Sequence, residues 1–548
     1  MSTSPACARV LVAQLVAQGV REAVLCPGSR SAPLALALFE ADAVGALRLH
    51  VRTDERSAGF LALGLAKASR TPAVVVTTSG TAVGNLLPAV MEAAHAGVGL
   101  VVVSADRPAA LVGFGANQTT DQVGLFDGFV RYTARVTSAA HPDTWAAQAA
   151  KAAVLAASGP VHLNVELDVP LVPGADEDAP ALADLIAAAR PLRRHRPVCG
   201  ECPAVELPAG PRTVVVAGDA PAEVGAAALA LATAAGVPLI AEPSSNARAG
   251  GALRCGRLVL AGPLGDEVER VIVFGHPTLS RPVTKLLSRE DVDLIVVADD
   301  DADWPDPGHR ARLVAPRVAL PAGAPAWLGR WRAADAEASA RVDAVVADAG
   351  LTGWSVAAAV WAAAADQSLV LGASQLIRDA DLAPVSGRPP GVYANRGLAG
   401  IDGTVSTALG VALAVPGRPT TLLCGDLTFL HDSNGLALGP GEPRPDLRIV
   451  VADDAGGAIF ATLEYGQDRF APTFERVFAT DPAVDLAALA ASYGVDVDVV
   501  ETDAALAAAL ARPPVGMEVV IARLDRSRRR ALSEAVTGGP PASGGPRG

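Results

Sequence analysis

Aromatic residues and cysteines are scarce in this sequence of 548 residues, of which 4% are aromatic and only six are cysteine. A secreted domain held together by disulfides needs a much higher density of cysteine, so a reducing cytoplasmic location is expected. An excess of basic residues is also missing, because 45 Lys and Arg are outnumbered by 58 Asp and Glu. The resulting net charge of −13 argues against non-specific nucleic-acid binding.

Long uninterrupted hydrophobic runs are absent as well. The most apolar stretch, residues 225–241, contains Gly236 and Pro238 and is predicted to form a helix, a turn and a strand rather than a membrane span. Residues 1–6 lack the charged start of a secretory signal. With 51% hydrophobic and 19% charged residues, the chain has the composition of a soluble globular protein with an aliphatic core.

Short β-branched runs alternate with helical patterns along most of the chain. This alternation predicts an α/β fold of three consecutive doubly wound parallel-sheet domains. Strands are expected at 23–26, 48–51, 73–77, 100–104 and 161–165, then at 213–217, 237–241, 270–274 and 293–297, and finally at 369–371, 420–424, 447–451 and 518–522. The first and third domains are interpreted as structural relatives, and the second as an empty spacer.

Changes in composition suggest where these domains begin and end. The predicted domains are 1–180, 181–345, which is the central spacer, and 346–535. Residues 170–211, rich in proline and charge, are interpreted as a linker. The Gly- and Pro-rich residues 536–548 are expected to be a disordered tail.

Two aspartates follow neighbouring predicted strands of the third domain. Asp426 and Asp454 are one strand–helix–strand crossover apart, and glycines lie close to both. Because ligands of open parallel sheets bind beyond the carboxyl ends of the strands, these carboxylates would meet at one edge. Hard oxygen ligands with positions left for phosphate oxygens suit Mg²⁺. Each aspartate could instead cap the helix that follows its strand.

The segments Gly425-Asp426 and Asp454-Ala455-Gly456 resemble the diphosphate-binding motif of thiamine-diphosphate enzymes. This resemblance implies that Asp426, Asp454 and the carbonyl of Gly456 hold Mg²⁺ (or Mn²⁺), which grips the diphosphate of the cofactor. Ala455 departs from the motif, in which Asn is usual.

Glu55 stands at the end of a predicted strand, within Asp54-Glu55-Arg56. Thiamine diphosphate becomes reactive when a carboxyl group beside its pyrimidine shifts the ring to the imino tautomer, and Glu55 is the candidate for that role. The alternative is a glutamate that only stabilises the dipole of its helix.

Further segments resemble one branch of these enzymes, the 2-succinyl-5-enolpyruvyl-6-hydroxy-3-cyclohexene-1-carboxylate (SEPHCHC) synthases of menaquinone biosynthesis. They are residues 27–34, 54–56, 78–82, 105–108, 115–118, 394–397 and 400–403. Members of this family are transferases that decarboxylate 2-oxoglutarate and add the succinic semialdehyde unit to isochorismate in a 1,4-addition. The resemblance therefore implies both substrates and thiamine diphosphate as the cofactor.

Carried over residue by residue, the resemblance implies three sets of site residues. The catalytic set is Glu55, Gln118 and Arg396. The cofactor-binding set is Glu55, Ser374, Ile401, Gly425, Leu427, Ile459 and Phe460. The substrate-binding set is Ser29, Arg30, Arg107, Asn117, Gln118, Arg281, Arg378 and Arg396. Arginine suits two dicarboxylic substrates because its guanidinium binds carboxylate in a bidentate way, although any single arginine could serve a surface ion pair. The apolar residues of the cofactor set could likewise be ordinary core residues.

Glu55 and the aspartate pair lie in different predicted domains, and in this superfamily the active site forms between chains. An obligate homodimer or a dimer of dimers (a homotetramer) is therefore expected.

Two other functions stay open. One is a thiamine-diphosphate carboligase related to acetolactate synthase, although such an enzyme would not need so many arginines. The other is a non-catalytic sensor, although a sensor would not need to keep Glu55 together with both aspartates. The pair Cys199 and Cys202 is not expected to bind zinc, because no second pair accompanies it.

Overall fold

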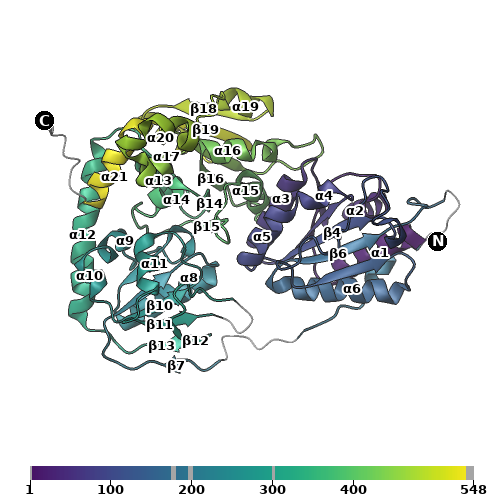
Figure 1. Cartoon of the computed structure of the whole chain (residues 1–548), viewed down its shortest axis with the longest axis horizontal. Helices are drawn as coiled ribbons and strands as arrows, with labels where there is room; N and C mark the ends of the chain where they lie inside the picture. The colour runs from purple at the N-terminus through teal and green to yellow at the C-terminus, as the bar shows by residue number, and fades with distance from the viewer. Residues whose placement is uncertain (1–2, 175–179, 195–201, 299–302, 539–548) are drawn as a thin grey trace. The chain divides into compact units, whose positions relative to one another are not determined.

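The computed structural model describes residues 3–174, 180–194, 202–298 and 303–538, in which three large sheets are all parallel (Figure 1). The first has the strand order β2-β1-β3-β4-β6-β5. Its strands are β1 (Glu22–Leu25), β2 (Arg48–Val51), β3 (Ala73–Thr77), β4 (Leu100–Asp106), β5 (Thr133–Thr137) and β6 (Val161–Glu166). Helices connect them, so the sheet is an α/β layer as predicted.

The central and third sheets repeat this architecture. The central order is β12-β11-β10-β8-β9, from β8 (Thr213–Ala217), β9 (Leu239–Ala241), β10 (Arg270–Phe274), β11 (Asp293–Val297) and β12 (Ala311–Ala315). The third order is β15-β14-β16-β17-β19-β18, from β14 (Ser368–Leu371), β15 (Gly391–Ala394), β16 (Thr420–Gly425), β17 (Leu447–Asp453), β18 (Asp496–Val500) and β19 (Met517–Arg523). The first and third sheets therefore share one topology, and the α/β fold class is confirmed.

The strands that sequence patterns did not indicate in these sheets, β5, β12, β15 and β18, all lie at sheet edges. The side chains of β18, for example, are mostly exposed or half-buried. An edge strand needs no continuous apolar run, because only part of its surface contacts the core. The buried strands β3, β8, β10 and β11 have the predicted boundaries.

By its internal contacts the chain divides into two compact units. The first consists of Met1–Arg196, Gly397–Gly417 and His431–Pro445, and the second of the other residues. Within the first unit, helix α3 (Glu55–Ser69) packs closely on α15 (Thr404–Ala414). A Cβ atom on Gly64 of α3 would lie 2.2 Å from the carbonyl oxygen of Thr407, so the two backbones can approach only because this residue is glycine.

Two expectations about connecting segments need correction. The stretch 170–211 is not purely a linker, because it contains helix α7 (Leu182–Ala188), whose Leu182 is buried in the core of the first sheet's domain beneath α1 (Thr3–Ala17) and α2 (Ala32–Ala43). The predicted tail begins too early, because helix α21 (Arg529–Thr537) includes residues 536 and 537, and Val536 is buried. Residues 539–548, like Cys199, lie outside the described residues. The domain boundaries themselves stay predictions.

None of the described helices is long and apolar enough to span a bilayer.

Candidate active site

Glu55 is the first residue of α3, and three residues separate it from the carboxyl end of β2. The helix is capped by Asp54, whose side chain accepts hydrogen bonds from the backbone N–H of Arg56 and Ser57 at 2.9 and 3.2 Å. Glu55 is therefore not needed as the cap. It is half-buried, and the amide of Asn85 donates to its Oε2 at 3.2 Å.

A buried carboxylate fastens this end of α3 to the start of α15. Asp432 accepts hydrogen bonds from the Ser57 hydroxyl (2.9 Å) and from the backbone N–H of Ser406 (2.7 Å). Burial raises the pKa of Asp432, and the hydrogen bonds from Ser406 and Ser57 act in the opposite direction. These contacts lie within the first compact unit and hold the helix that carries Glu55 in place.

A second polar cluster follows β3 and β4 in the same unit. Arg107 donates to the Ser79 hydroxyl at 2.6 Å and to the carbonyl oxygen of Gln118 at 2.7 Å. The side-chain amide of Gln118 in turn donates to the carbonyl oxygen of Ser79 at 2.8 Å. Arg107 and Gln118, both predicted from the sequence, are thus brought together. Asn117 and Ser29 are exposed.

Arg30 lies close enough to Arg107 for their charges to interact. Its guanidinium donates to the carbonyl oxygen of Leu167 at 2.8 Å. Burial lowers the pKa of Arg30, and the charge of Arg107 lowers it further. The carboxylates of Asp168 and Asp106 act in the opposite direction, and an anion bound by both guanidinium groups would relieve their mutual repulsion.

Behind this cluster lies a buried network that sequence patterns did not reveal. Asp106 accepts from the backbone N–H of Arg107 (2.7 Å) and from the amide of Asn164 (2.9 Å). Gln122 donates to Asn164 at 3.0 Å and accepts from the backbone N–H of Gly80 at 2.8 Å. The network joins the loops after β3 and β4. Because its members are far apart in the sequence, no local sequence motif predicts it.

The predicted aspartate pair forms in the second compact unit. The adjacent strands β16 and β17 are in register up to Gly425 and Ala452, so Asp426 and Asp454 follow them at the same edge. They are only 3% and 9% exposed. Asp426 is the first residue of α16 (Asp426–His431), and its carboxylate accepts from the backbone N–H of Gly456 at 2.6 Å. It therefore binds the loop after β17 as well as its own helix.

These two carboxylates are electrostatically unfavourable on their own. Burial raises the pKa of Asp426 to about 6. The pKa of Asp454 is raised well above 3.8 by burial and then by the charge of Asp426. Two buried acids of like charge fit a divalent cation, which would neutralise both. The described residues contain no cluster of three or more His, Cys, Asp or Glu side chains suited to a metal. The fit is thus to a cation completed by carbonyl and phosphate oxygens.

The loop after Asp454 has a backbone that requires glycine. Gly456 has φ +130°, and a Cβ atom there would lie 2.3 Å from the carbonyl oxygen of Ala479. Ala455 also has a positive φ, +57°. Its carbonyl oxygen accepts a 2.7 Å hydrogen bond from Arg526.

A third cluster in the same unit contains two further arginines that the sequence analysis predicted to bind substrate. Arg378, on α14 (Gln375–Ala380), donates to the carbonyl oxygen of Ser374, which has the unusual φ of +78°. Arg396 follows β15, is only 2% exposed, and donates to the Thr278 hydroxyl at 2.7 Å. Burial lowers the pKa of Arg378, and the charge of Arg396 lowers it further. These arginines form a second pair of neighbouring cations.

The other predicted site residues occupy varied positions. Ile459 and Phe460 are half-buried on α17 (Ala458–Ala461). Arg281 makes an exposed ion pair with Glu464 at 3.0 Å. Ile401 is half-buried in the first compact unit. Gly425 and Leu427 flank Asp426 and are half-buried.

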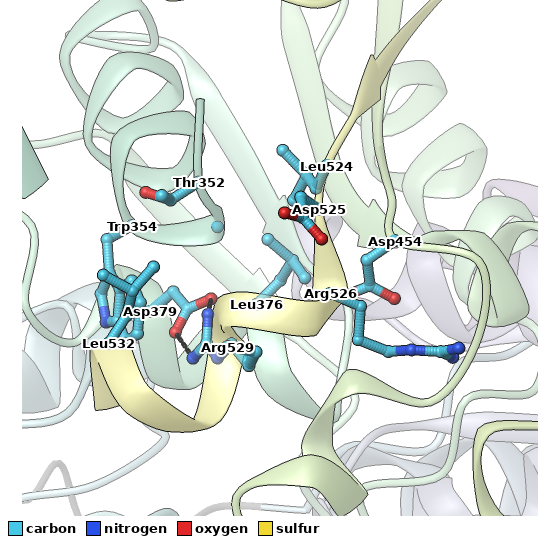
Figure 2. Close-up of a pocket in the computed structure, with 11 residues that line it drawn as sticks. Thr352, Trp354, Leu376, Asp379, Asp454, Leu524, Asp525, Arg526, Arg529 and Leu532 are labelled. Carbon is cyan, nitrogen blue, oxygen red and sulfur yellow. Dashed lines mark hydrogen bonds and ion pairs between the residues drawn. The ribbon is translucent and has the colours of Figure 1, made fainter. Parts of the chain in front are cut away.

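A small cavity lies behind Asp454 (Figure 2). It is bordered by Arg526 and by the ion pair of Asp379 with Arg529, whose guanidinium lies over the ring of Trp354 at 3.8 Å. Its volume of about 20 Å³ is enough for one water molecule but not for a cofactor. The ion pair therefore anchors α21 behind the aspartate pair rather than forming a binding site.

Comparison with known families identifies the class first. The N-terminal TPP-binding domain of thiamine pyrophosphate enzymes matches residues 6–125, and the C-terminal TPP-binding domain matches residues 379–518. The chain is thus built as a thiamine pyrophosphate (thiamine diphosphate) enzyme, and that compound is its cofactor. Both aspartates lie in the C-terminal match and Glu55 in the N-terminal one.

Full-length relatives define the family more narrowly. The chain is 50% identical to the 2-succinyl-5-enolpyruvyl-6-hydroxy-3-cyclohexene-1-carboxylate synthase of Kineococcus radiotolerans, with 98% of each chain covered. It is 49% identical to that of Paenarthrobacter aurescens, over 97% of this chain and 96% of the relative, and 43% identical to that of Mycolicibacterium smegmatis, over 98% and 99%. The chain belongs to the SEPHCHC synthase family, and the predicted resemblance is confirmed.

Proposed function

We propose that this protein decarboxylates 2-oxoglutarate and transfers the resulting succinic semialdehyde unit to isochorismate, forming SEPHCHC and CO₂. The observation that carries this proposal is the presence of two arginine pairs, Arg30 with Arg107 and Arg378 with Arg396, one in each compact unit. Each pair follows strands of a sheet whose edge also carries a carboxylate expected to serve the cofactor. Two dicarboxylic substrates account for two such cationic sites.

The cofactor would be held by the aspartate pair through a cation. Asp426 and Asp454, with the carbonyl of Gly456, would bind Mg²⁺ or Mn²⁺, and the cation would bind the diphosphate. Once bound, thiamine diphosphate supplies the carbon nucleophile and the electron sink that decarboxylation of a 2-oxo acid needs. Glu55 would hold a proton at its carboxyl group against the pyrimidine, while Asn85 keeps that group oriented through its hydrogen bond.

The arginine pairs would divide the substrates between them. Arg378 and Arg396 lie in the same compact unit as the aspartates, so we assign them to the donor acid, which must bond to the cofactor. Arg30 and Arg107 lie in the unit of Glu55 and would bind the acceptor, with Asn117 and Gln118 at the rim. Ile459 and Phe460 would exclude water from the carbanionic centre that forms when CO₂ leaves.

We further propose that the active site forms between two copies of the chain, in a dimer or a dimer of dimers, and that the enzyme works in the cytoplasm, where its cofactor and substrates are available. A dimeric arrangement would let Glu55 of one copy serve the aspartate pair of another. Sedimentation of the purified protein tests the assembly state directly, and a monomer at micromolar concentration that retains full activity would contradict it.

The test of the reaction is a reconstituted assay. Purified protein, thiamine diphosphate, Mg²⁺, 2-oxoglutarate and isochorismate are combined, and both isochorismate absorbance and product mass are followed. We expect isochorismate to disappear with 2-oxoglutarate and to persist when pyruvate replaces it. Equal consumption with pyruvate would favour a carboligase of the acetolactate-synthase type, and no consumption with either donor would overturn the proposal.

A further inference from the structure

A side chain that follows a strand of the central sheet contacts Arg396, one of the two arginines proposed to bind the donor acid. Thr278 follows β10 and lies beyond Gly275, His276 and Pro277, and its hydroxyl oxygen accepts a 2.7 Å hydrogen bond from Nη2 of Arg396. Thr278 is exposed, whereas Arg396 is buried. Both belong to the second compact unit. The central domain, which the sequence analysis interpreted as an empty spacer, therefore contacts a proposed substrate-binding arginine.

The turn that carries Thr278 is fixed by a buried acid. Glu242, only 4% exposed, follows β9 in the same sheet. Its carboxylate accepts the backbone N–H of Leu279 at 2.9 Å and that of Thr278 at 3.2 Å. At the other end of the turn, the backbones of Asp219 and His276 exchange hydrogen bonds of 3.1 and 2.9 Å. Thr278 is therefore anchored from two sides and has little freedom to follow Arg396 if that side chain moves.

The charges around this turn do not by themselves fix the orientation of the Arg396 guanidinium. Arg396 lies near the cation of Arg378, which repels it, and near Glu242, whose pKa is raised to about 8 by burial and by Asp381. A like charge on one side and a buried acid on another do not define a single orientation for the planar group. A hydroxyl acceptor held at a set position does define one, because a guanidinium N–H that donates to it fixes the direction of the whole planar group.

We infer that Thr278 is a positioning residue that orients Arg396 for the distal carboxylate of the donor 2-oxo acid, with Glu242 holding Thr278 in place. The inference rests on the proposed function, since the donor is assigned there to this arginine pair. A preoriented guanidinium binds a dicarboxylic acid without first losing rotational freedom. The central domain would thereby contribute to the preference for 2-oxoglutarate over a monocarboxylic 2-oxo acid.

The test compares Thr278→Val with Thr278→Ser. Valine matches the shape of threonine but lacks the hydroxyl acceptor, whereas serine retains it. Because Thr278 is exposed, we expect both variants to fold like the wild type. We expect Thr278→Val to raise the KM for 2-oxoglutarate about 3- to 10-fold, which is the range of a typical net hydrogen-bond contribution. We expect kcat and the KM for isochorismate to change little, because the lost interaction is one of donor binding. Thr278→Ser should behave like the wild type.

A second link is tested through Glu242→Gln, which removes one of the two backbone hydrogen bonds. If Glu242 acts through Thr278, the effects of Glu242→Gln and Thr278→Val on the KM for 2-oxoglutarate will not add in the double variant. Full additivity would overturn the proposed role of Glu242, and equal KM values for Thr278→Val and Thr278→Ser would overturn that of Thr278.

Calorimetric binding of glutarate, an unreactive dicarboxylate, separates this inference from the proposed reaction. It is measured with thiamine diphosphate and Mg²⁺ present. Weaker glutarate binding by Thr278→Val than by Thr278→Ser supports the inference even if the wild type fails to consume isochorismate, a result that would overturn only the proposed function. Identical glutarate affinities would overturn the inference even if the wild type forms the product.

Discussion

Arg526 donates a 2.7 Å hydrogen bond to the carbonyl oxygen of Ala455, the residue that follows the second aspartate of the pair. The same guanidinium binds Glu475 at 2.6 Å, so it ties the loop after β17 to a later segment of the chain. Ala455 has a left-handed backbone that alanine adopts at a cost of about 1–2 kcal/mol, whereas asparagine tolerates it better. The hydrogen bond from Arg526 to Ala455 acts as a clamp that holds this strained backbone in place.

We expect Arg526→Met to weaken Mg²⁺-dependent binding of thiamine diphosphate about 3- to 10-fold, the range of a typical net hydrogen-bond contribution. Ala455→Asn in the same background should recover part of the loss, because asparagine relieves the strained backbone. Quenching of intrinsic fluorescence during Mg²⁺ titration measures the affinity. Arg528→Met is the matched control, since Arg528 contacts the carbonyl oxygen of Ala349 instead. An Arg526 variant with wild-type affinity would contradict the clamp.

Adjacent aspartates allow a matched comparison for the metal. Asp454→Ala should raise the Mg²⁺ concentration needed for cofactor binding by more than the roughly 10- to 100-fold that loss of an outer-shell partner causes. Asp453→Ala should have a much smaller effect, because the Asp453 side chain accepts a 3.3 Å hydrogen bond from the backbone N–H of Ala455 and acts on Asp426 through its charge alone. Calorimetric titration with Mg²⁺ and thiamine diphosphate compares the two. Equal losses in both variants would contradict Asp454 as the ligand.

Replacement of Glu55 by glutamine should abolish turnover while cofactor affinity and the thermal midpoint remain near wild type. Glutamine retains the size of the side chain but cannot hold the required proton, and Asp54 still caps the helix. The measurements are steady-state turnover, cofactor titration and thermal unfolding. Turnover within a few-fold of wild type would show that another group activates the cofactor.

Mixing two inactive variants tests whether the active site is shared between copies. Chains with Glu55→Gln and chains with Asp454→Ala are co-expressed with different affinity tags, and the mixed assembly is isolated. If each site takes Glu55 from one chain and the aspartates from another, a mixed dimer has one intact site and shows about half of the wild-type activity. Complete inactivity of a folded mixed dimer would indicate that each site uses a single chain.

His162 is expected to make stability depend on pH. Its ring contacts the Ser104 hydroxyl at 2.7 Å and the edge of Phe126, and burial lowers its pKa from 6.5 to about 4. Between these two values the unfolded chain takes up a proton at His162 and the folded chain does not. The contribution of the neutral His162 ring to the free energy of unfolding is therefore fully present above pH 6.5 and is lost as the pH falls toward 4.

The midpoint of thermal unfolding of the first compact unit should therefore fall by several degrees between about pH 7 and pH 5. The variant His162→Gln should show a smaller decrease over that range, since glutamine does not titrate. His141→Gln, at an exposed histidine, should retain the wild-type pH dependence. Parallel curves for wild type and His162→Gln would contradict the assignment.

Much of the fold was predictable because buried parallel strands have continuous apolar runs. The boundaries of β3, β8, β10 and β11 agree with the sequence prediction for that reason. The edge strands β5, β12, β15 and β18 were missed because half-exposed residues need no such run. Helix α7 was missed because its segment has the Pro-rich composition of a linker, although Leu182 is completely buried.

The candidate site divides in the same way. Asp426, Asp454 and Glu55 were identified from short motifs, in which the residue type and its position after a strand carry the chemistry. Asn85, Gln122 and Thr278 were not identified from the sequence. Each forms a hydrogen bond with a residue at least 30 positions away, and no local motif marks it.

The order of residues along the chain determined the family, the parallel α/β domains and the residue types that can bind a cation or a carboxylate. These properties follow from hydrophobic periodicity and from motifs read within one strand and its turn. Only the tertiary structure decided that Arg526 holds the loop of Asp454 and that Thr278 of the central domain contacts Arg396. Such pairs depend on how separate strand ends meet in space, and a side chain's distant partner leaves no trace in its local sequence.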